Sequence, residues 1–341
     1  MEENVHQPLS KIKVETESIP VIDIYFNRNC NLDCSYCYSP HSKASMTKED
    51  LDIFLEALQE ATDAKYFYTL KILGGDPTLY PYIDYFMEHL PDGHKIIFTT
   101  NAQKLLKLSE KSRLNLKDRM NFTISIHPDY FYSKNYLKNI KKFMDSFPEF
   151  NKNILCNLYR NDTPESFYGN DLMRWLTSLN LGNKIYVNFN AILTAEYYPP
   201  KNTDLYVEYF TKNIGSEYYE NSKRSYKING EKSNIWDIYR LHENILDTTG
   251  FKNRVLCELT EYSLFHDLTF MVRCIDKVLY TKDSKEKFHL HTSPNMVMCP
   301  NRVCDLNCYL DLNKTFIQFS QKEKSRRKRG KFTAGLKNGA T

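Results

Sequence analysis

From residue 20 onward, the sequence alternates short runs of β-branched and aromatic residues with longer segments of helical periodicity. This alternation is typical of repeated β-α-β units, which build a parallel sheet. Six strands are expected, at residues 21–26, 68–73, 95–100, 121–126, 153–159 and 184–191. Because parallel strands are joined by right-handed crossovers, six such units predict an α/β fold, a partial (β/α)6 barrel with its helices outside.

Helical patterns fill the gaps between these strands. The clearest follows Thr47, which precedes Asp50 as in a capping box and starts a row of leucines and Phe54 on one face. Further helices are expected at residues 82–90, 103–112, 134–146 and 164–178, the last with Thr163 as its cap. The carboxyl ends of the strands should then face a common cleft, which is where α/β folds bind ligands.

The cysteines are clustered, which points to metal binding. Three of the nine lie within residues 30–37 and three within residues 299–308. Tight groups in a long chain are typical of metal sites rather than of a disulfide framework. Residues 1–20 hold no apolar signal-peptide core, and no later stretch approaches the ~18 apolar residues of a membrane-spanning helix. We therefore expect a cytoplasmic protein that does not contact a membrane.

The first cysteine group directly follows the first expected strand. The local sequence NCNLDCSYCY spaces Cys30, Cys34 and Cys37 as C-x3-C-x2-C. Three thiolates can hold three irons of a cubane [4Fe–4S] cluster and leave the fourth iron open to a small ligand. The alternative is a structural zinc site, although zinc usually takes four N or S ligands, commonly in C-x2–4-C pairs.

The second expected strand runs into a glycine-rich segment, Gly74-Gly75-Asp76-Pro77. Glycines let the backbone approach a ligand closely, and the acid that follows can accept hydrogen bonds from an ammonium group. Taken alone, the segment is a common turn. Its place after the strand next to the cysteine segment favours cofactor binding.

The spacing C-x3-C-x2-C, with an aromatic residue before the last cysteine, resembles the radical S-adenosylmethionine (SAM) superfamily. The text CNLDCSYCY is similar to the branch of anaerobic sulfatase maturases and peptide-modifying enzymes. The resemblance implies that SAM chelates the open iron and that Tyr36 lies against its adenine. It also implies that the segment from Gly74 to Pro77 binds the SAM amino group, with Asp76 in place of the usual Glu. An electron from the cluster would cleave SAM to a 5′-deoxyadenosyl radical, which abstracts a substrate hydrogen.

Later strand ends supply weaker candidates for cofactor binding. Asn101 ends the third strand much as relatives end it, Ser125 lies where relatives place a ribose-contacting serine, and Asn157 lies on the fifth strand. For each of these residues, an ordinary hydrogen-bonded turn is the alternative. Cys156, alone on the fifth strand, is expected to be a small core residue.

A second cysteine group follows near the C-terminus. The segment between Cys257 and Cys274 reads as a hairpin bracketed by cysteines and resembles the opening of a twitch or SPASM domain, although Thr269 stands where that pattern has glycine. The full seven-cysteine SPASM pattern is absent. We expect one auxiliary [4Fe–4S] cluster with four thiolate ligands, the alternative being a zinc ribbon. The ligands would be Cys257, Cys274 and two of Cys299, Cys304 and Cys308.

These features divide the chain into five parts: an N-terminal segment (1–19), a radical SAM core (20–195), a connector (196–250), an auxiliary-cluster domain (251–312) and a basic, disordered tail (313–341). Residues 322–341 hold eight Lys and Arg against one Glu. Such an arm would attract nucleic acid or an acidic peptide, and a solubilising tail is the alternative.

The leading hypothesis is an oxidoreductase-type radical SAM enzyme that modifies a peptide or protein. It would take electrons from a donor such as flavodoxin or ferredoxin. Because few residues precede the first strand, a separate recognition protein would bind the substrate. The alternatives are a radical SAM enzyme acting on RNA or a nucleotide, and a non-catalytic iron–sulfur or zinc-binding scaffold.

Overall fold

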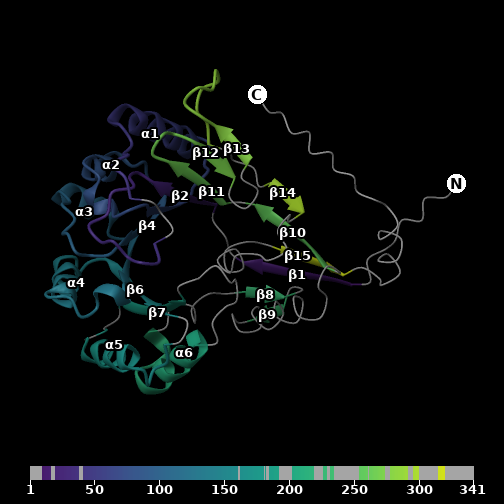
Figure 1. Ribbon diagram of the computed structural model, residues 1–341. Coiled ribbons are helices and arrows are strands. Elements are labelled where there is room, and N and C mark those ends of the chain that lie inside the picture. The colour runs from purple at the N-terminus through teal and green to yellow at the C-terminus, as the bar shows by residue number, and fades with distance from the viewer. Residues whose placement is uncertain are drawn as a thin grey trace, which may run out of the picture.

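Two sheets organise the computed structural model (Figure 1). One has nine strands and carries the helices, and the other has six antiparallel strands. The structure describes residues 10–16, 20–37, 41–159, 162–179, 181, 184–191, 202–218, 226–228, 231–233, 253–259, 261–272, 277–290, 295–298 and 314–318.

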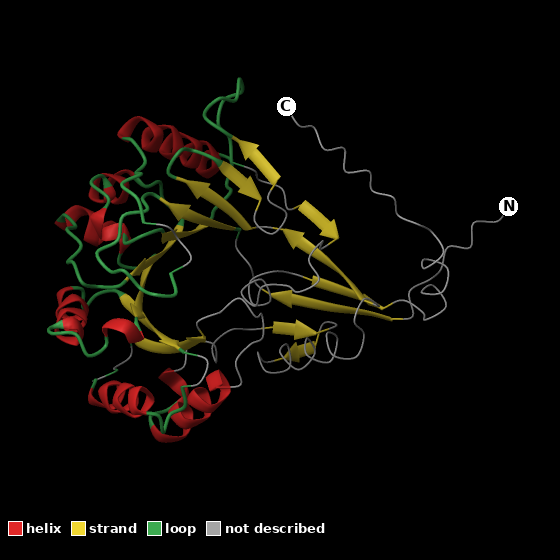
Figure 2. Ribbon diagram, in the orientation of Figure 1, coloured by secondary structure: helices red, strands yellow, loops and turns green. Residues whose placement is uncertain are grey.

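The expected six parallel strands form the larger part of the nine-stranded sheet, adjacent to one another in chain order. They are β2 (Val21–Tyr25), β3 (Thr69–Leu73), β4 (Lys95–Thr100), β5 (Met120–Ile126), β6 (Asn151–Leu158) and β7 (Ile185–Ala191). The strands curve, and the helices cover the outer side of the curve (Figure 2). The predicted α/β fold is therefore confirmed.

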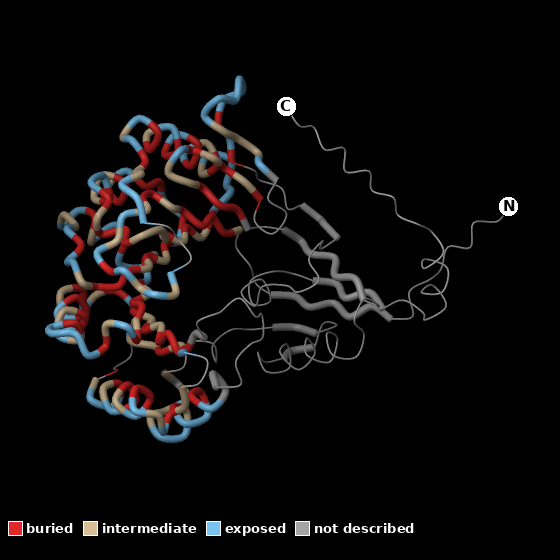
Figure 3. Tube along the Cα trace, viewed as in Figure 1, coloured by how far each residue is buried: buried red, intermediate tan, exposed pale blue. Residues whose placement is uncertain are grey.

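The helices bury one face each against this sheet, as the buried residues in Figure 3 show. They are α1 (Lys48–Asp63), α2 (Ile83–His89), α3 (Glu110–Leu116), α4 (Tyr136–Ser146), α5 (Phe167–Ser178) and α6 (Asn202–Asn213), with short 3-10 turns at η1 (Pro77–Leu79), η2 (Pro128–Tyr130) and η3 (Ser216–Tyr218). Among the helices described, none combines the length and the apolar character of a transmembrane segment.

Side-chain caps decide where the helices begin. Thr47 caps α1 as expected, since its side chain accepts a hydrogen bond from the amide of Asp50 at 3.2 Å. Two other helices begin later than expected. Ser109 caps α3, so the helix does not include residue 103, and Ser166 rather than Thr163 caps α5. Each stretch holds several residues able to cap, and periodicity alone does not choose between them.

The first part of the expected auxiliary domain belongs to the core sheet. Strand β11 (Glu261–Phe265) pairs in parallel with β2, and β12 (Phe270–Val272) and β13 (Lys277–Tyr280) continue the sheet antiparallel. The expected hairpin is thus present, and its residues pack in the same hydrophobic core as the barrel. The physical reason is that β2 would otherwise leave an open sheet edge.

Ion pairs hold the end of this segment on α1. Lys282 lies 2.7 Å from the buried carboxylate of Asp50. Lys287 lies 2.8 Å from Glu56 and 2.6 Å from Glu60. The segment after β13 therefore covers the first helix of the core.

The six-stranded sheet combines strands from the N-terminal segment, the connector, the expected auxiliary domain and the C-terminal tail. Its order is β14 (Asn295–Met298), β10 (Asn253–Leu259), β15 (Lys314–Gln318), β1 (Ser10–Thr16), β8 (Tyr226–Ile228) and β9 (Glu231–Ser233). β15 lies in the expected disordered tail, but its β-forming residues 315–317 pair with β1 on one side and β10 on the other. The basic residues 322–341 lie outside the described residues.

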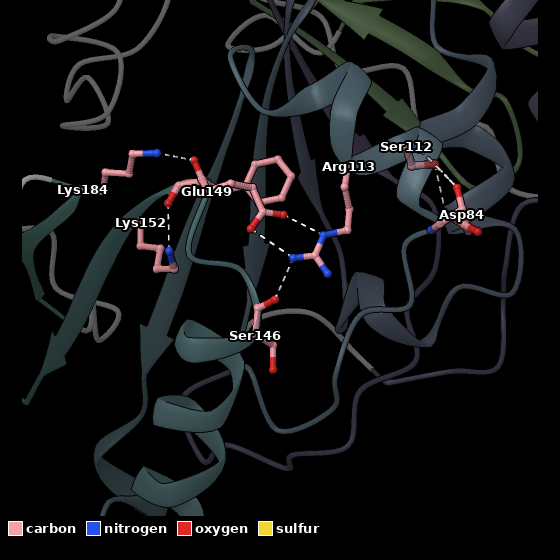
Figure 4. Close-up of polar contacts among 9 residues, drawn as sticks. Asp84, Ser112, Arg113, Ser146, Glu149, Lys152 and Lys184 are labelled. Atoms are coloured by element: carbon pink, nitrogen blue, oxygen red, sulfur yellow. Dashed lines mark hydrogen bonds and ion pairs between the residues drawn. The ribbon is translucent and has the colours of Figure 1, made fainter.

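Polar contacts brace the amino ends of β6 and β7 (Figure 4). Arg113 donates two hydrogen bonds to the Glu149 carboxylate, at 2.7 and 3.0 Å, and one to the carbonyl of Ser146. Lys152 and Lys184 donate to the carbonyls of residues 150 and 149. This edge of the sheet is opposite the one that carries the cysteine segment.

Candidate metal and cofactor site

The three cysteines lie on a loop, residues 27–46, that leaves the carboxyl end of β2 and returns alongside itself. Its base is closed by hydrogen bonds from the Met46 amide to the Phe26 carbonyl and from the Arg28 amide to the Ala44 carbonyl, at 2.8 and 3.0 Å. Cys30 and Cys34 are partly buried, and Cys37 is exposed. The Cys37 amide donates to the Cys34 carbonyl, so a tight turn joins the last two cysteines.

The glycine segment supports the base of this loop. The amide of Gly75 donates to the Asn27 carbonyl at 3.2 Å, and that of Asp76 donates to the Asn29 carbonyl at 2.7 Å. A Cβ on Gly74 would collide with the Asn27 carbonyl oxygen, and one on Gly75 with the Asn29 carbonyl oxygen. The close approach that these glycines allow is therefore to the backbone of the cysteine loop, immediately before Cys30.

The Asp76 carboxylate is fully buried and already accepts hydrogen bonds from the protein. Its donors are the amide and hydroxyl of Thr78, the hydroxyl of Thr100 and the amide of Asn101, at 2.5 to 3.0 Å. A carboxylate offers about four acceptor positions. Asp76 thus joins the ends of β3 and β4, and a ligand ammonium group would have to be bound by other acceptors.

One such acceptor, absent from the sequence-based candidates, is Asn27 at the end of β2. Its side chain is 2% exposed, and its Nδ2 donates to the Asp76 carbonyl at 3.3 Å. The Oδ1 atom has no hydrogen-bond partner within the described part of the chain. Buried acceptors are rarely left unpaired, so a missing ligand group is a good explanation. No motif in the sequence marks this residue.

The thiols have polar neighbours on two strand ends. Asn101, after β4, places Nδ2 3.6 Å from the sulfur of Cys30. His127, after β5, places Nδ1 3.5 Å from the sulfur of Cys34 and 2.6 Å from the hydroxyl of Tyr36. The structure therefore brings the predicted residues Tyr36 and Asn101 to the cysteines.

The charge state of the two partly buried thiols, Cys30 and Cys34, follows from their burial. Burial raises the pKa of Cys34 to about 12; a hydrogen bond with Tyr36 lowers it, and the charge of Asp129 adds to the rise. Burial also raises the pKa of Cys30, and a hydrogen bond from the amide of Leu32 lowers it. The metal-free thiols of Cys30 and Cys34 are therefore protonated at neutral pH, and because metals bind thiolates, loading the site must release protons.

The turn after β5 holds the tip of the cysteine loop. The carboxylate of Asp129 accepts a hydrogen bond from the amide of Ser35, and the hydroxyl of Tyr130 accepts one from the amide of Asp33, both at 2.7 Å. These two amides flank Cys34. Sequence reasoning missed this turn as part of the site, because Pro128 signals a turn but not what the turn contacts.

The remaining predicted cofactor residues lie at the same sheet edge and are buried. Pro77 starts η1, and Ser125 ends β5 with its carbonyl accepting from Tyr136 at 3.4 Å. Asn157 donates to the Ile126 carbonyl at 3.0 Å, which links β6 to β5. The roles of Ser125 and Asn157 as cofactor contacts stay predictions.

The second cysteine group is not placed by the structure. The backbone of Cys257 lies in β10, but its side chain and Cys274, Cys299, Cys304 and Cys308 lie outside the described residues. Cys156 is fully buried, as a core residue should be. Over the described residues, no three His, Cys, Asp or Glu side chains are gathered around one metal ion. A cubane cluster does not require such a group, because each of its thiolate ligands binds a separate iron.

Comparison with known proteins identifies the region that carries the site. Residues 24–156, from within β2 to within β6, match the radical SAM superfamily. No curated protein matches the chain.

Similar solved structures include Streptococcus suis SuiB bound to precursor peptide SuiA, 15% identical, with 80% of this chain and 64% of that chain covered and a TM-score of 0.49. SuiB bound to S-adenosylmethionine is 17% identical, with 76% of this chain and 61% of that chain covered and a TM-score of 0.46. Native anSMEcpe with bound AdoMet and Kp18Cys peptide is 18% identical, with 79% of this chain and 80% of that chain covered and a TM-score of 0.47. The chain thus spans less than two thirds of the SuiB chain.

Proposed function

We propose that the chain, whose residues 24–156 match the radical SAM superfamily, is an enzyme that holds a [4Fe–4S] cluster on Cys30, Cys34 and Cys37 and cleaves SAM. The observation that carries the proposal is the cysteine loop itself. Its base is fixed by the glycine segment and its tip by the turn after β5. Three thiols are thereby presented at the carboxyl edge of a parallel sheet, where this class of fold binds ligands.

The donor set fits the cluster. The three cysteines supply three of the four sulfur ligands that a closed cluster would need, which leaves one iron for SAM. The bound cluster, once reduced, would supply one electron to the sulfonium of SAM, and breaking its carbon–sulfur bond would give methionine and the 5′-deoxyadenosyl radical that abstracts a hydrogen atom from the substrate.

The chain's own residues would bind and orient the cofactor. Asn101 would donate a hydrogen bond to the Cys30 thiolate, and the unpaired Oδ1 of Asn27 would accept one from the SAM ammonium group. Gly74 and Gly75 would line this part of the site with backbone atoms, and Tyr36 would pack against the adenine. Asp76 would act indirectly, by holding the Asn101 amide in place.

Ser125 and Asn157 are proposed as cofactor contacts on the neighbouring strand ends. Pro77 would fix the turn that follows the glycines, since it occupies the first position of η1. We also propose an auxiliary [4Fe–4S] cluster on Cys257, Cys274 and two of Cys299, Cys304 and Cys308.

We propose a peptide or protein as the substrate of an oxidoreductase-type reaction. Besides the motif resemblance, the sheet edge that carries the cysteines also carries exposed aromatic side chains. Tyr132, after β5, and Phe167, at the start of α5, stack at 5.3 Å and are 55% and 77% exposed. Tyr and Phe are enriched at the core of protein–protein interfaces relative to the rest of the surface. A flavodoxin or ferredoxin would supply the electron, and a separate protein could present the substrate.

Anaerobic reconstitution with iron and sulfide, followed by reductant and SAM, tests the central proposal. The full chain should form 5′-deoxyadenosine, and replacing Cys30, Cys34 and Cys37 together by Ala should abolish it while iron stays at the auxiliary site. Cys156→Ala is the matched control, because this cysteine lies in the core, and it should retain the activity. A cluster-loaded protein that forms no 5′-deoxyadenosine would instead be the non-catalytic scaffold.

Modification of RNA or a nucleotide is the second candidate, favoured by the eight Lys and Arg of residues 322–341. Deleting these residues should then remove salt-dependent RNA binding. If the intact protein binds no RNA at low salt, this candidate is excluded.

A further inference from the structure

His127 contacts the cysteine loop at two points from the end of β5. Its Nδ1 lies 2.6 Å from the Tyr36 hydroxyl and 3.5 Å from the Cys34 sulfur. The imidazole and the Tyr36 ring lie nearly parallel, with centroids 6.1 Å apart and planes at 20°. One side chain thus contacts both a proposed cluster ligand and the aromatic residue that precedes the next one.

The groups at the two ends of the short contact can form one hydrogen bond. A phenol hydroxyl carries a proton that it can donate, and an imidazole nitrogen without a proton accepts one. We assign Nδ1 as the acceptor of the Tyr36 proton, which places the ring proton on Nε2.

The backbone of His127 is fixed independently of this contact. Its amide donates to the Tyr136 hydroxyl at 2.8 Å, and the next residues form the turn whose Asp129 and Tyr130 hold the loop tip. His127 therefore offers an acceptor in a fixed position. Tyr36 also meets Tyr159 edge to face at 6.0 Å, which limits rotation of its ring.

We infer that His127 is a positioning residue for the cofactor site: by accepting the Tyr36 hydroxyl hydrogen bond, it sets the orientation of the Tyr36 ring and of the turn from Cys34 to Cys37. The inference rests on the proposed function, in which Tyr36 packs against SAM. Beyond that function, the orientation of the Tyr36 ring is set by a side chain at the end of another strand, that of His127. Any hydrogen-bond acceptor at the Nδ1 position should do the same.

Four variants of the full, cluster-loaded chain test this inference. Tyr36→Phe keeps the ring and removes the donor, His127→Leu removes the acceptor, and the double variant removes both. His127→Asn keeps an acceptor, because the Asn side-chain oxygen reaches about where Nδ1 lies. Tyr85→Phe is the matched control, since its hydroxyl donates to Asp52 on the outer helices.

The first measurement is the dissociation constant for SAM under anaerobic conditions, with the electron paramagnetic resonance spectrum of the reduced cluster before and after SAM. Loss of one hydrogen bond should weaken SAM binding about two- to tenfold in Tyr36→Phe and in His127→Leu. The double variant should be no weaker than either single variant, because both remove the same bond. His127→Asn and Tyr85→Phe should bind as the wild type does.

The second measurement is the rate at which a chelator removes iron, which does not depend on SAM. Tyr36→Phe and His127→Leu should accelerate it equally, since both free the same turn. The inference is overturned if the His127→Leu effects add fully to those of Tyr36→Phe, or if His127→Leu lowers only thermal stability. If the wild type binds no SAM, the proposed function fails, while the iron-release rates still decide whether His127 positions the turn.

Discussion

Replacing Gly75 by Ala should separate the cysteine loop from the sheet that supports it. The new Cβ would collide with the carbonyl group of Asn29, which is backbone and has no rotamer that could move it away. To make room, the chain must move residues 27–29 away from β3. That movement breaks the hydrogen bonds from Gly75 to Asn27 and from Asp76 to Asn29.

The cost of this change can be estimated from those contacts. Two backbone hydrogen bonds are worth about 1–3 kcal/mol together, and overpacking against backbone adds about 1–3 kcal/mol. We therefore expect Gly75→Ala to lower the free energy of unfolding of the metal-free protein by about 2–6 kcal/mol. Any relief comes from displacement of Asn29, and the adjacent Cys30 would move with it.

Urea unfolding and the iron content after anaerobic reconstitution measure the two effects. Gly93→Ala is the matched control: its φ of +90° disfavours alanine and its Cβ would meet the Phe67 ring, but it precedes β4, whereas the cysteine loop follows the carboxyl end of β2. The control should lose stability and still load iron, whereas Gly75→Ala should lose both. Wild-type stability together with wild-type iron content in Gly75→Ala would refute the reasoning.

Two further predictions concern stability away from the cysteines. Burial lowers the pKa of His94 to about 4, and its Nδ1 accepts a hydrogen bond from the Tyr68 amide at 3.1 Å. The free energy of unfolding should therefore be greatest above pH 6.5 and should fall by about 3 kcal/mol as the pH drops from 6.5 through 4, because the unfolded chain protonates His94 first. Urea unfolding should show a weaker pH dependence in His94→Gln. Arg113→Met removes the two hydrogen bonds to Glu149 and should lower the free energy of unfolding by about 1 kcal/mol at pH 7. The loss should be smaller at low pH. Burial raises the pKa of Glu149, but the bonds from Arg113 outweigh it and hold this pKa below its usual value, so they are weakened once Glu149 is protonated. Iron loading of Arg113→Met should equal that of the wild type, and a loss of iron would show that the two sheet edges are coupled.

The parts of the fold that local pattern determines were predictable. The six parallel strands lie close to their expected positions because each is a short apolar run bounded by turn residues. The pairing of β11 with β2 was not predictable, since nothing in the periodicity of residues 261–265 specifies a partner at the other end of the chain. The start of α5 was missed because Thr163 and Ser166 are both good caps, and only tertiary contacts select one.

In the candidate site, too, features set by local sequence were predictable and features set by tertiary contacts were not. The cysteine spacing and the glycine pair were readable because backbone geometry requires those residue types there. The engagement of Asp76 by four protein donors was not readable, because it depends on Thr100 and Asn101 from the next strand. The contacts of His127 and the unpaired oxygen of Asn27 likewise arise from residues that lie far apart in sequence.

The place of β2 in its sheet has a consequence for biosynthesis. This strand is made early, yet it lies between β3 and β11, and β11 emerges only after most of the chain has been translated. Until then, a nascent chain exposes the edge of the strand that carries the cysteine loop. Such distant pairings form slowly, because the intervening chain must first be ordered. Completion of the sheet, and with it a settled cysteine loop, therefore has to wait for the synthesis of β11.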